Sequence, residues 1–129
     1  MEAQAPADPK VILLVEDNGI VREYARFCME DQGFRVLSAG SGEQALAMLD
    51  SHGGNIDLLV ADVSLPVMSG LQLAVQVRRR YPHVGVLFVS GADMRHSFEI
   101  LERNVDFLQK PYTSAALAEA VALMFSSCE

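Results

Sequence analysis

The sequence predicts an α/β fold, a single doubly wound sheet of five parallel strands with five helices on its two faces. Two observations lead to this prediction. Short continuous apolar runs recur along the chain, and runs without polar alternation are typical of strands buried on both faces of a parallel sheet. Segments with helical periodicity lie between these runs, and this alternation favours an open parallel sheet with right-handed crossovers.

Five segments have the composition of strands, and three of them are strong candidates. The strong segments are residues 11–15, 58–61 and 84–89, and the weaker ones are residues 34–38 and 105–108. Each strong run stops at polar residues, so the end of each strand can be placed closely.

The first two helices follow the first two strands. One helix has apolar residues at the i, i+3, i+4, i+7, i+8 spacing of a single face, namely Val21, Tyr24, Ala25, Cys28 and Met29. Gly33 stands where a helix C-cap is expected. The next helix begins at Ser41, because Ser41 and Gln44 have the spacing of a capping box.

Three more helices are expected in the second half of the chain. The third carries Leu71 and Val75 and ends near Pro82, since proline does not continue a helix. A short fourth helix is expected over residues 94–103. Thr113 caps the fifth helix, whose buried face carries Leu117, Val121 and Met124.

Length and composition indicate one domain. The chain has 129 residues, half of them hydrophobic, which fits one domain with one core. Residues 1–9 are rich in alanine and proline and are expected to form a tail or linker, and the domain is expected over residues 10–126. The formal net charge of −7 disfavours direct binding to nucleic acid or anionic membrane. With no signal peptide or long apolar run in the sequence, a cytoplasmic protein is expected.

Polar residues follow the strong strands at positions that should meet in space. Glu16 and Asp17 follow the first strand, Asp62 and Ser90 follow the other two, and Lys110 follows the last weak one. The carboxyl ends of parallel strands share one edge of the sheet, where ligands bind. Taken singly, such residues are usually helix caps, turn formers or surface charges. Their joint occurrence at successive strand ends favours a functional site.

The chemistry of these side chains is that of phosphoryl transfer. Three neighbouring carboxylates repel one another unless a cation lies among them, and oxygen ligands suit Mg²⁺. A carboxylate such as Asp62 can attack phosphorus and form an aspartyl-phosphate. Lys110 and Ser90 can bind phosphoryl oxygens.

Four segments resemble the receiver domain of two-component response regulators. They are V-I-L-L-V-E-D-N from residue 11, D-L-L-V-A-D-V-S-L-P-V-M-S-G over residues 57–70, V-L-F-V-S-G-A over residues 86–92 and D-F-L-Q-K-P-Y over residues 106–112. The resemblance covers residues 10–125, and the pattern D-x-x-L-P-x-M-x-G is highly specific. It implies a flavodoxin-like receiver fold.

The resemblance implies a role for each matching residue. Asp62 matches the phosphoacceptor, and Glu16 and Asp17 match the acidic pair that holds Mg²⁺, with Asp17 the preferred direct ligand. Ser64 matches the position whose backbone carbonyl contacts the metal. Ser90 matches the hydroxyl switch residue.

Three further roles follow from the same resemblance. Lys110 matches the phosphate-binding lysine, and the bond before Pro111 is expected to be cis. Phe107 matches an aromatic switch position at which the family often has tyrosine. Because phenylalanine cannot donate a hydrogen bond, a switch at Phe107 would depend on packing.

The resemblance also implies partners. The phosphoryl donor would be the phosphohistidine of a histidine kinase or a phosphotransfer domain, and the phosphorylated surface would bind an output protein. The domain would not be an enzyme acting on a separate substrate, although it would catalyse its own phosphorylation and dephosphorylation. A monomer or a weak phosphorylation-dependent dimer is expected. The segments L-F-V-S-G and F-L-Q-K-P are similar to those of receivers in hybrid sensor histidine kinases. The sequence leaves open whether the chain is free-standing or part of such a kinase.

Two alternatives compete with the interpretation as a receiver domain. The first is a Mg²⁺-dependent phosphatase or phosphotransferase with an aspartate nucleophile. Such an enzyme would carry its nucleophile in an Asp-x-Asp-x loop after the first strand, whereas Asp62 follows the third, and it would need extra residues for a cap over a substrate pocket. A pseudo-receiver that is no longer phosphorylated would not need the complete set of acidic, hydroxyl and lysine residues.

Overall fold

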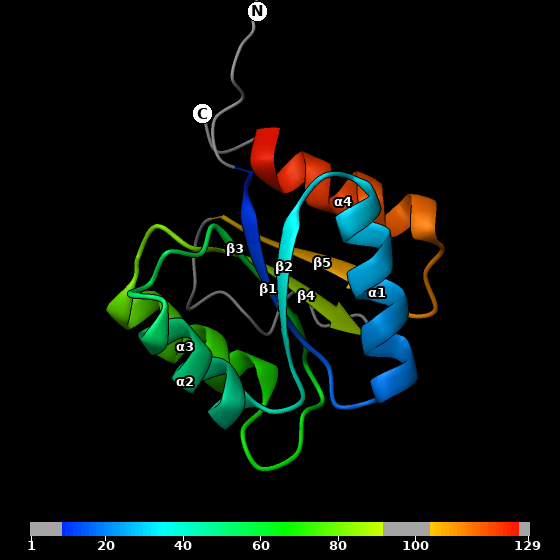
Figure 1. Ribbon diagram of the computed structural model, residues 1–129. Helices are drawn as coiled ribbons and strands as arrows, with labels where there is room; N and C mark the ends of the chain where they lie inside the picture. Colours follow the sequence, from blue (N-terminus) through cyan, green and yellow to red (C-terminus); the bar gives the residue numbers. More distant parts are fainter. Residues whose placement is uncertain (1–8, 92–103, 127–129) are drawn as a thin grey trace, which may run out of the picture.

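The structure is a computed structural model that describes residues 9–91 and 104–126 (Figure 1). Strands and helices alternate along the chain. The elements are β1 (Val11–Val15), α1 (Gly19–Asp31), β2 (Arg35–Ala39), α2 (Gly42–Ser51), β3 (Leu58–Asp62), α3 (Gly70–Arg80), β4 (Gly85–Ser90), β5 (Val105–Gln109) and α4 (Ser114–Ser126).

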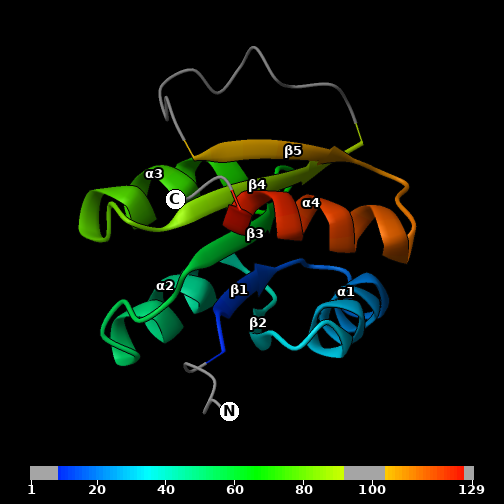
Figure 2. The same ribbon diagram turned by 90° about the horizontal axis from the view of Figure 1, so that it is seen from above.

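The five strands form one parallel sheet in the order β2-β1-β3-β4-β5. Helices α1 and α4 cover one face of the sheet and α2 and α3 cover the other, as Figure 2 shows. β3 lies at the centre between β1 and β4, and all five of its residues are buried. The predicted fold class is therefore confirmed.

The observed strands begin and end within one residue of the predicted ranges. The helices predicted first, second, third and fifth correspond to α1, α2, α3 and α4. The predicted short helix over residues 94–103 lies outside the described residues. Within the described ranges, no helix is long and apolar enough to cross a membrane.

The core has one half on each face of the sheet. On the side of α2 and α3, side chains such as Leu13, Leu59 and Phe88 are completely buried. On the side of α1 and α4, Leu117 and Val121 pack with strand residues that point to the opposite face of the sheet, such as Leu14 and Val60. Burial on both faces explains why the central strands have no polar alternation.

The helix ends are fixed largely as predicted. Gly33 follows α1 with a φ of 97°, a left-handed conformation that glycine adopts without a Cβ clash. The hydroxyl of Ser41 accepts a hydrogen bond from the backbone N–H of Gln44 at 3.1 Å. The other half of the expected capping box differs, because the side chain of Gln44 accepts from the N–H of Gly40 instead of that of Ser41.

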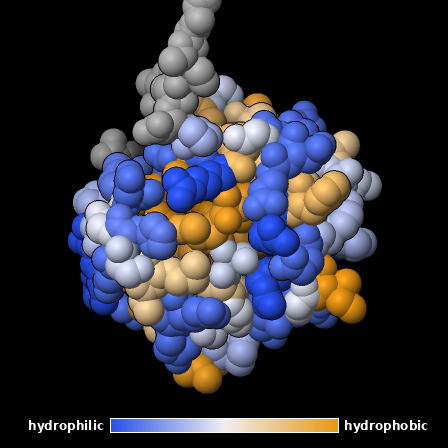
Figure 3. Space-filling model, in the orientation of Figure 1, coloured by the Kyte–Doolittle hydropathy of each residue, from blue (hydrophilic) through white to orange (hydrophobic). Residues whose placement is uncertain are grey.

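The sheet edge formed by β2 is less completely covered than the centre. Val36 and Leu37 of β2 are only half-buried. Figure 3 shows an apolar area in the middle of this side of the molecule, surrounded by hydrophilic residues. On α1, Ala25, Cys28 and Met29 are buried as the periodicity predicts, whereas Tyr24 at the border of that face is 46% exposed.

Candidate functional site

Asp62 occupies the carboxyl end of the central strand. It is the last residue of β3, it pairs in register with Val89 of β4, and it is only 7% exposed. The carboxyl ends of β1, β4 and β5 lie at the same end of the parallel sheet, so residues far apart in the sequence can reach the Asp62 carboxylate.

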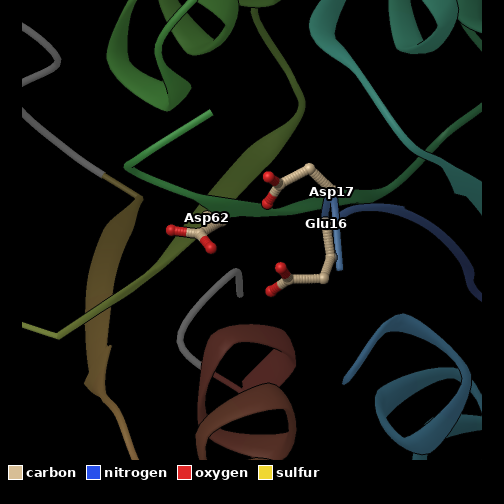
Figure 4. A group of neighbouring side chains, drawn as sticks. All are labelled: Glu16, Asp17 and Asp62. Atoms are coloured by element: carbon tan, nitrogen blue, oxygen red, sulfur yellow. The ribbon is translucent and has the colours of Figure 1, made fainter. Parts of the chain in front are cut away.

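Three carboxylates meet at this edge. One oxygen from each of Glu16, Asp17 and Asp62 lies within 4.8 Å of the other two. Figure 4 shows the three side chains approaching one another, two from the loop after β1 and one from the end of β3. Glu16 and Asp62 are buried and Asp17 is exposed. Like charges this close are stabilised by a cation, and an all-oxygen set matches the ligand preference of Mg²⁺.

Lys110 lies between two of these carboxylates. Its Nζ donates to Oδ2 of Asp62 at 2.7 Å and to Oε1 of Glu16 at 3.0 Å. Burial lowers the pKa of Lys110, but the hydrogen bonds and charges of Asp62 and Glu16 outweigh burial and hold the pKa above its usual value. The ammonium group is thus charged. It lies close enough to Asp62 to donate a hydrogen bond to a phosphoryl oxygen bound there.

The loop after β5 places Lys110 at the site. The backbone N–H of Lys110 donates to the carbonyl of Ser90 at 2.7 Å, which joins the ends of β5 and β4. The peptide bond between Lys110 and Pro111 is cis.

Glu16 and Asp17 are neighbours with different surroundings. The second carboxylate oxygen of Glu16, Oε2, accepts from the backbone N–H of Asn18 at 3.1 Å, so protein groups bind both of its oxygens. Burial raises the pKa of Glu16, and the nearby charge of Asp62 adds to that rise. Among the described residues, the Asp17 carboxylate has no hydrogen bond to protein. It is therefore free to bind a hydrated cation.

The loop after β3 holds Asp62 from the other side. Oδ1 of Asp62 accepts from the backbone N–H of Ser64 at 2.9 Å. The loop is closed by a hydrogen bond from the N–H of Gly70 to the carbonyl of Val63 at 3.0 Å. Gly70 packs directly on this backbone, because a Cβ built on it would lie 2.3 Å from the carbonyl oxygen of Asp62.

Ser90 and Phe107 lie on the neighbouring strands. Ser90 ends β4 and is 6% exposed. Phe107 of β5 pairs in register with Phe88 of β4, and their rings stack with centroids 5.5 Å apart. Phe107 is half-buried, so its position depends on packing against Phe88 rather than on a side-chain hydrogen bond.

Three residues near the site were not singled out from the sequence. Asn18 caps α1, and its N–H binds Glu16; its preference for N-caps was a usable signal. The guanidinium of Arg22 donates to the carbonyl of Glu16 at 2.8 Å. Burial and the charge of Glu16 raise the pKa of Tyr112 to about 12. No local pattern in the sequence indicates the contact of Arg22 or the surroundings of Tyr112.

A family model described as "Response regulator receiver domain" matches residues 12–122. The chain belongs to the response regulator receiver family. As a receiver domain it is a phosphoacceptor signalling domain of two-component systems. The acidic cluster, the lysine and the parallel sheet described above occur together in a chain that this family model covers almost completely.

The relatives of this receiver domain are both kinases and stand-alone regulators. It is 34% identical over 119 residues to the sensor kinase CckA of Brucella abortus, covering 88% of this chain and 12% of CckA. It is also 34% identical to the chemotaxis protein CheY of Pseudomonas aeruginosa, covering 88% of this chain and 94% of CheY. The chain therefore spans a small part of some relatives and nearly the whole of others.

Solved structures show the same fold. The receiver domain superposes on a response regulator receiver protein of Sinorhizobium medicae with a TM-score of 0.84, at 31% identity over 95% of this chain and 98% of that chain. It superposes on the receiver domain of the hybrid histidine kinase CckA with a TM-score of 0.77, at 36% identity over 88% of this chain and 97% of that chain.

Proposed function

We propose that this receiver domain accepts a phosphoryl group on the carboxylate of Asp62 and thereby switches a surface that binds a partner. The observation that carries the proposal is the contact of Lys110 Nζ with Asp62 Oδ2 at 2.7 Å, inside a cluster of three carboxylates. A buried aspartate between a fixed cation and an acidic pair has the surroundings that an acyl-phosphate requires.

The residues at the site fit Mg²⁺. Asp17 and Asp62 supply carboxylate oxygens, and the backbone carbonyl of Ser64 is the third proposed ligand. Glu16 already binds Lys110 and the N–H of Asn18, so it contributes mainly negative charge near the ion. A bound Mg²⁺ supplies charge neutralisation for the transferring phosphoryl group.

The protein groups have defined tasks in the transfer. A carboxylate oxygen of Asp62 attacks phosphorus, the N–P bond of the donor phosphohistidine breaks, and the electron pair of that bond returns to the imidazole nitrogen. Lys110 binds an oxygen of the arriving group and compensates its charge. Burial of Asp62 limits the access of water, so the product persists until the slow hydrolysis that the domain also catalyses.

The phosphoryl group then biases the conformation of the neighbouring strand ends. It adds about −1.5 to −2 charge and three acceptor oxygens at Asp62. The ammonium of Lys110 and the hydroxyl of Ser90 are the donors that would bind them. Movement of the backbone that carries Lys110 and Ser90 would let Phe107 change its packing on Phe88. This change would alter the surface of β5 and α4, where an output protein would bind.

The proposed partner that donates the phosphoryl group is a histidine kinase or a histidine phosphotransfer domain. Relatives with this domain include sensor kinases as well as CheY, so both a free-standing regulator and the receiver of a hybrid kinase are consistent with the family. We propose that residues 10–126 form the domain, residues 1–9 a linker, and that it acts in the cytoplasm as a monomer or weak dimer.

The two alternatives are not favoured. A phosphatase of the aspartate-nucleophile type would place its nucleophile after β1, whereas the carboxylate that contacts Lys110 most closely is Asp62 at the end of β3. A pseudo-receiver would have lost part of the site, whereas this chain keeps the acidic pair, Asp62, Ser90 and Lys110 in its sequence.

The test is labelling by a small phosphodonor. Incubation of the wild type with phosphoramidate and Mg²⁺ should add one acid-labile phosphoryl group, detected by intact mass, and Asp62→Asn should abolish it. Asp50→Asn is the matched control, because Asp50 is exposed on α2 and pairs with Arg80. Undiminished labelling of folded Asp62→Asn would overturn the proposal.

A further inference from the structure

Arg22 in the first turns of α1 contacts the backbone of the acidic pair. Its Nη1 donates to the carbonyl oxygen of Glu16 at 2.8 Å. That carbonyl belongs to the peptide group that joins Glu16 to Asp17. Since a peptide group is planar, a hydrogen bond that fixes the carbonyl also fixes the direction in which the chain enters Asp17.

The guanidinium group lies between three segments of the chain. A Cβ built on Gly40 would lie 3.4 Å from Nη1 of Arg22, and a Cβ built on Gly19 would lie 3.5 Å from its Nη2. Gly40 follows β2 and Gly19 begins α1. Arg22 therefore binds the backbone that follows β1 and lies close to the start of α1 and to the loop after β2.

Asp17 depends on its backbone for orientation. Its side chain is exposed, and no hydrogen bond from the described part of the protein holds its carboxylate. Glu16 differs, because Lys110 and the N–H of Asn18 hold its carboxylate directly. Two backbone contacts therefore bear on Asp17: Arg22 fixes the peptide group before it, and the N–H of Asn18 that binds Glu16 fixes the peptide group after it.

We propose that Arg22 is a positioning residue for the magnesium site, which orients Asp17 through the carbonyl of Glu16. This inference rests on the proposed function, since it needs Mg²⁺ to bind at the acidic cluster. In this role Arg22 acts through the backbone carbonyl of Glu16 and not through a carboxylate that binds the metal. Its contribution is to reduce the number of directions that the Asp17 side chain samples before the ion arrives.

Electrostatics alone predicts the opposite effect. A guanidinium beside a cation site repels the cation, so removal of its charge should tighten the binding of Mg²⁺. Loss of the positioning contact should weaken binding. The sign of the change in affinity for Arg22→Met therefore separates the two roles, because methionine keeps the length of the side chain and removes both the charge and the donors.

The experiment is a calorimetric titration of the purified chain with MgCl₂. Arg22→Met should bind Mg²⁺ roughly tenfold more weakly than the wild type, at the lower end of the range for groups that orient metal ligands. Arg22→Lys keeps one donor and should recover part of the affinity. Arg26→Met is the matched control, because Arg26 is on the same helix and pairs only with the exposed Glu23 and Glu30 among the described residues; its affinity should equal that of the wild type.

Two further readouts separate positioning from a merely structural role. The thermal midpoint in EDTA should fall equally little in Arg22→Met and Arg26→Met, and saturating Mg²⁺ should restore the phosphorylation rate of Arg22→Met. Equal or tighter Mg²⁺ binding by Arg22→Met, or a lower midpoint with unchanged affinity, would overturn the inference. Absence of Mg²⁺ binding by the wild type would instead overturn the metal site of the proposed function.

Discussion

The ammonium of Lys110 lies 2.7 Å from Oδ2 of Asp62, although 48 positions separate the two residues in the sequence. The same group lies 3.0 Å from Oε1 of Glu16. One cation therefore compensates two of the three carboxylates in the cluster. The site keeps an excess of negative charge, which favours the entry of a divalent cation.

The first prediction concerns the ammonium group of Lys110. Lys110→Met should lower the free energy of unfolding by about 1–2 kcal/mol in EDTA, because it leaves the carboxylates of Glu16 and Asp62 close together without a counter-charge. Millimolar Mg²⁺ should restore much of the loss. Urea unfolding with and without Mg²⁺ measures both effects.

Arg80→Met is the control for Lys110→Met. It breaks the exposed ion pair with Asp50, which is expected to contribute about 0.2–1 kcal/mol and to show no dependence on Mg²⁺. If Lys110→Met were as stable as the wild type in EDTA, the counter-charge role of Lys110 would be wrong.

The second prediction separates the two neighbouring acids. Asp17→Asn should weaken Mg²⁺ binding by more than about tenfold, since Asp17 has the one carboxylate of the cluster that no described protein group holds. Glu16→Gln should weaken it less, because Glu16 already binds Lys110 and the N–H of Asn18. Calorimetric titration with MgCl₂ checks the order, and a larger loss in Glu16→Gln would reverse the assignment of the direct ligand.

The third prediction concerns alkaline pH. Burial and the charge of Glu16 raise the pKa of Tyr112 from its ordinary value of 10.0 to about 12. The folded state thus keeps this proton after the unfolded state has lost it. The free energy of unfolding should therefore fall as the pH rises from about 10 to about 12.

Absorbance of tyrosinate during a pH titration measures this shift directly. The component that titrates near pH 12 should disappear in Tyr112→Phe and persist in Tyr81→Phe. The fall in stability above pH 10 should also be smaller in Tyr112→Phe. A late component that survives in Tyr112→Phe would show that another group is responsible.

The fourth prediction tests the packing of the loop after β3. Gly70→Ala would place a Cβ 2.3 Å from the carbonyl oxygen of Asp62 and 2.9 Å from Cα of Val63. Because backbone atoms cannot rotate away, the loop must shift, at a cost of about 3 kcal/mol. Phosphorylation of Asp62 should slow as well.

Gly91→Ala is the matched control for Gly70→Ala. Apart from the chain neighbours of Gly91, no atom of the described residues lies within 4 Å of a Cβ built on it, so the change should alter the free energy of unfolding by less than about 0.5 kcal/mol. Denaturant melts of the two variants give the comparison. Equal stability of both would contradict the close packing described here.

The elements of the fold could be predicted because the central strands are buried on both faces. Burial makes the runs around Leu13, Leu59 and Leu87 continuously apolar, and the polar residues that end them mark one edge of the sheet. Because the ends of neighbouring parallel strands share that edge, the sequence alone predicts that Glu16 and Asp62 lie close together. The roles assigned to individual residues came from the resemblance to receiver domains, and they are still predictions.

Other features could not be predicted because they depend on contacts distant in the sequence or on backbone geometry. Arg22 binds a backbone carbonyl, and a carbonyl is present at every position, so no pattern marks the partner. Val67 adopts a φ of 69°, with a hydrogen bond from the N–H of Met68 to the carbonyl of Pro66. A β-branched residue rarely adopts this conformation, and its identity would have predicted an extended backbone.

The most direct test of the account is to locate the phosphoryl group on the chain. After phosphorylation by phosphoramidate with Mg²⁺, reduction with borohydride converts a phosphorylated aspartate to homoserine, and peptide mass spectrometry finds the changed residue. The account predicts homoserine at position 62 alone, and none in a sample incubated with phosphoramidate in excess EDTA. Homoserine at another aspartate, or a phosphorylated chain with position 62 unchanged, would contradict it.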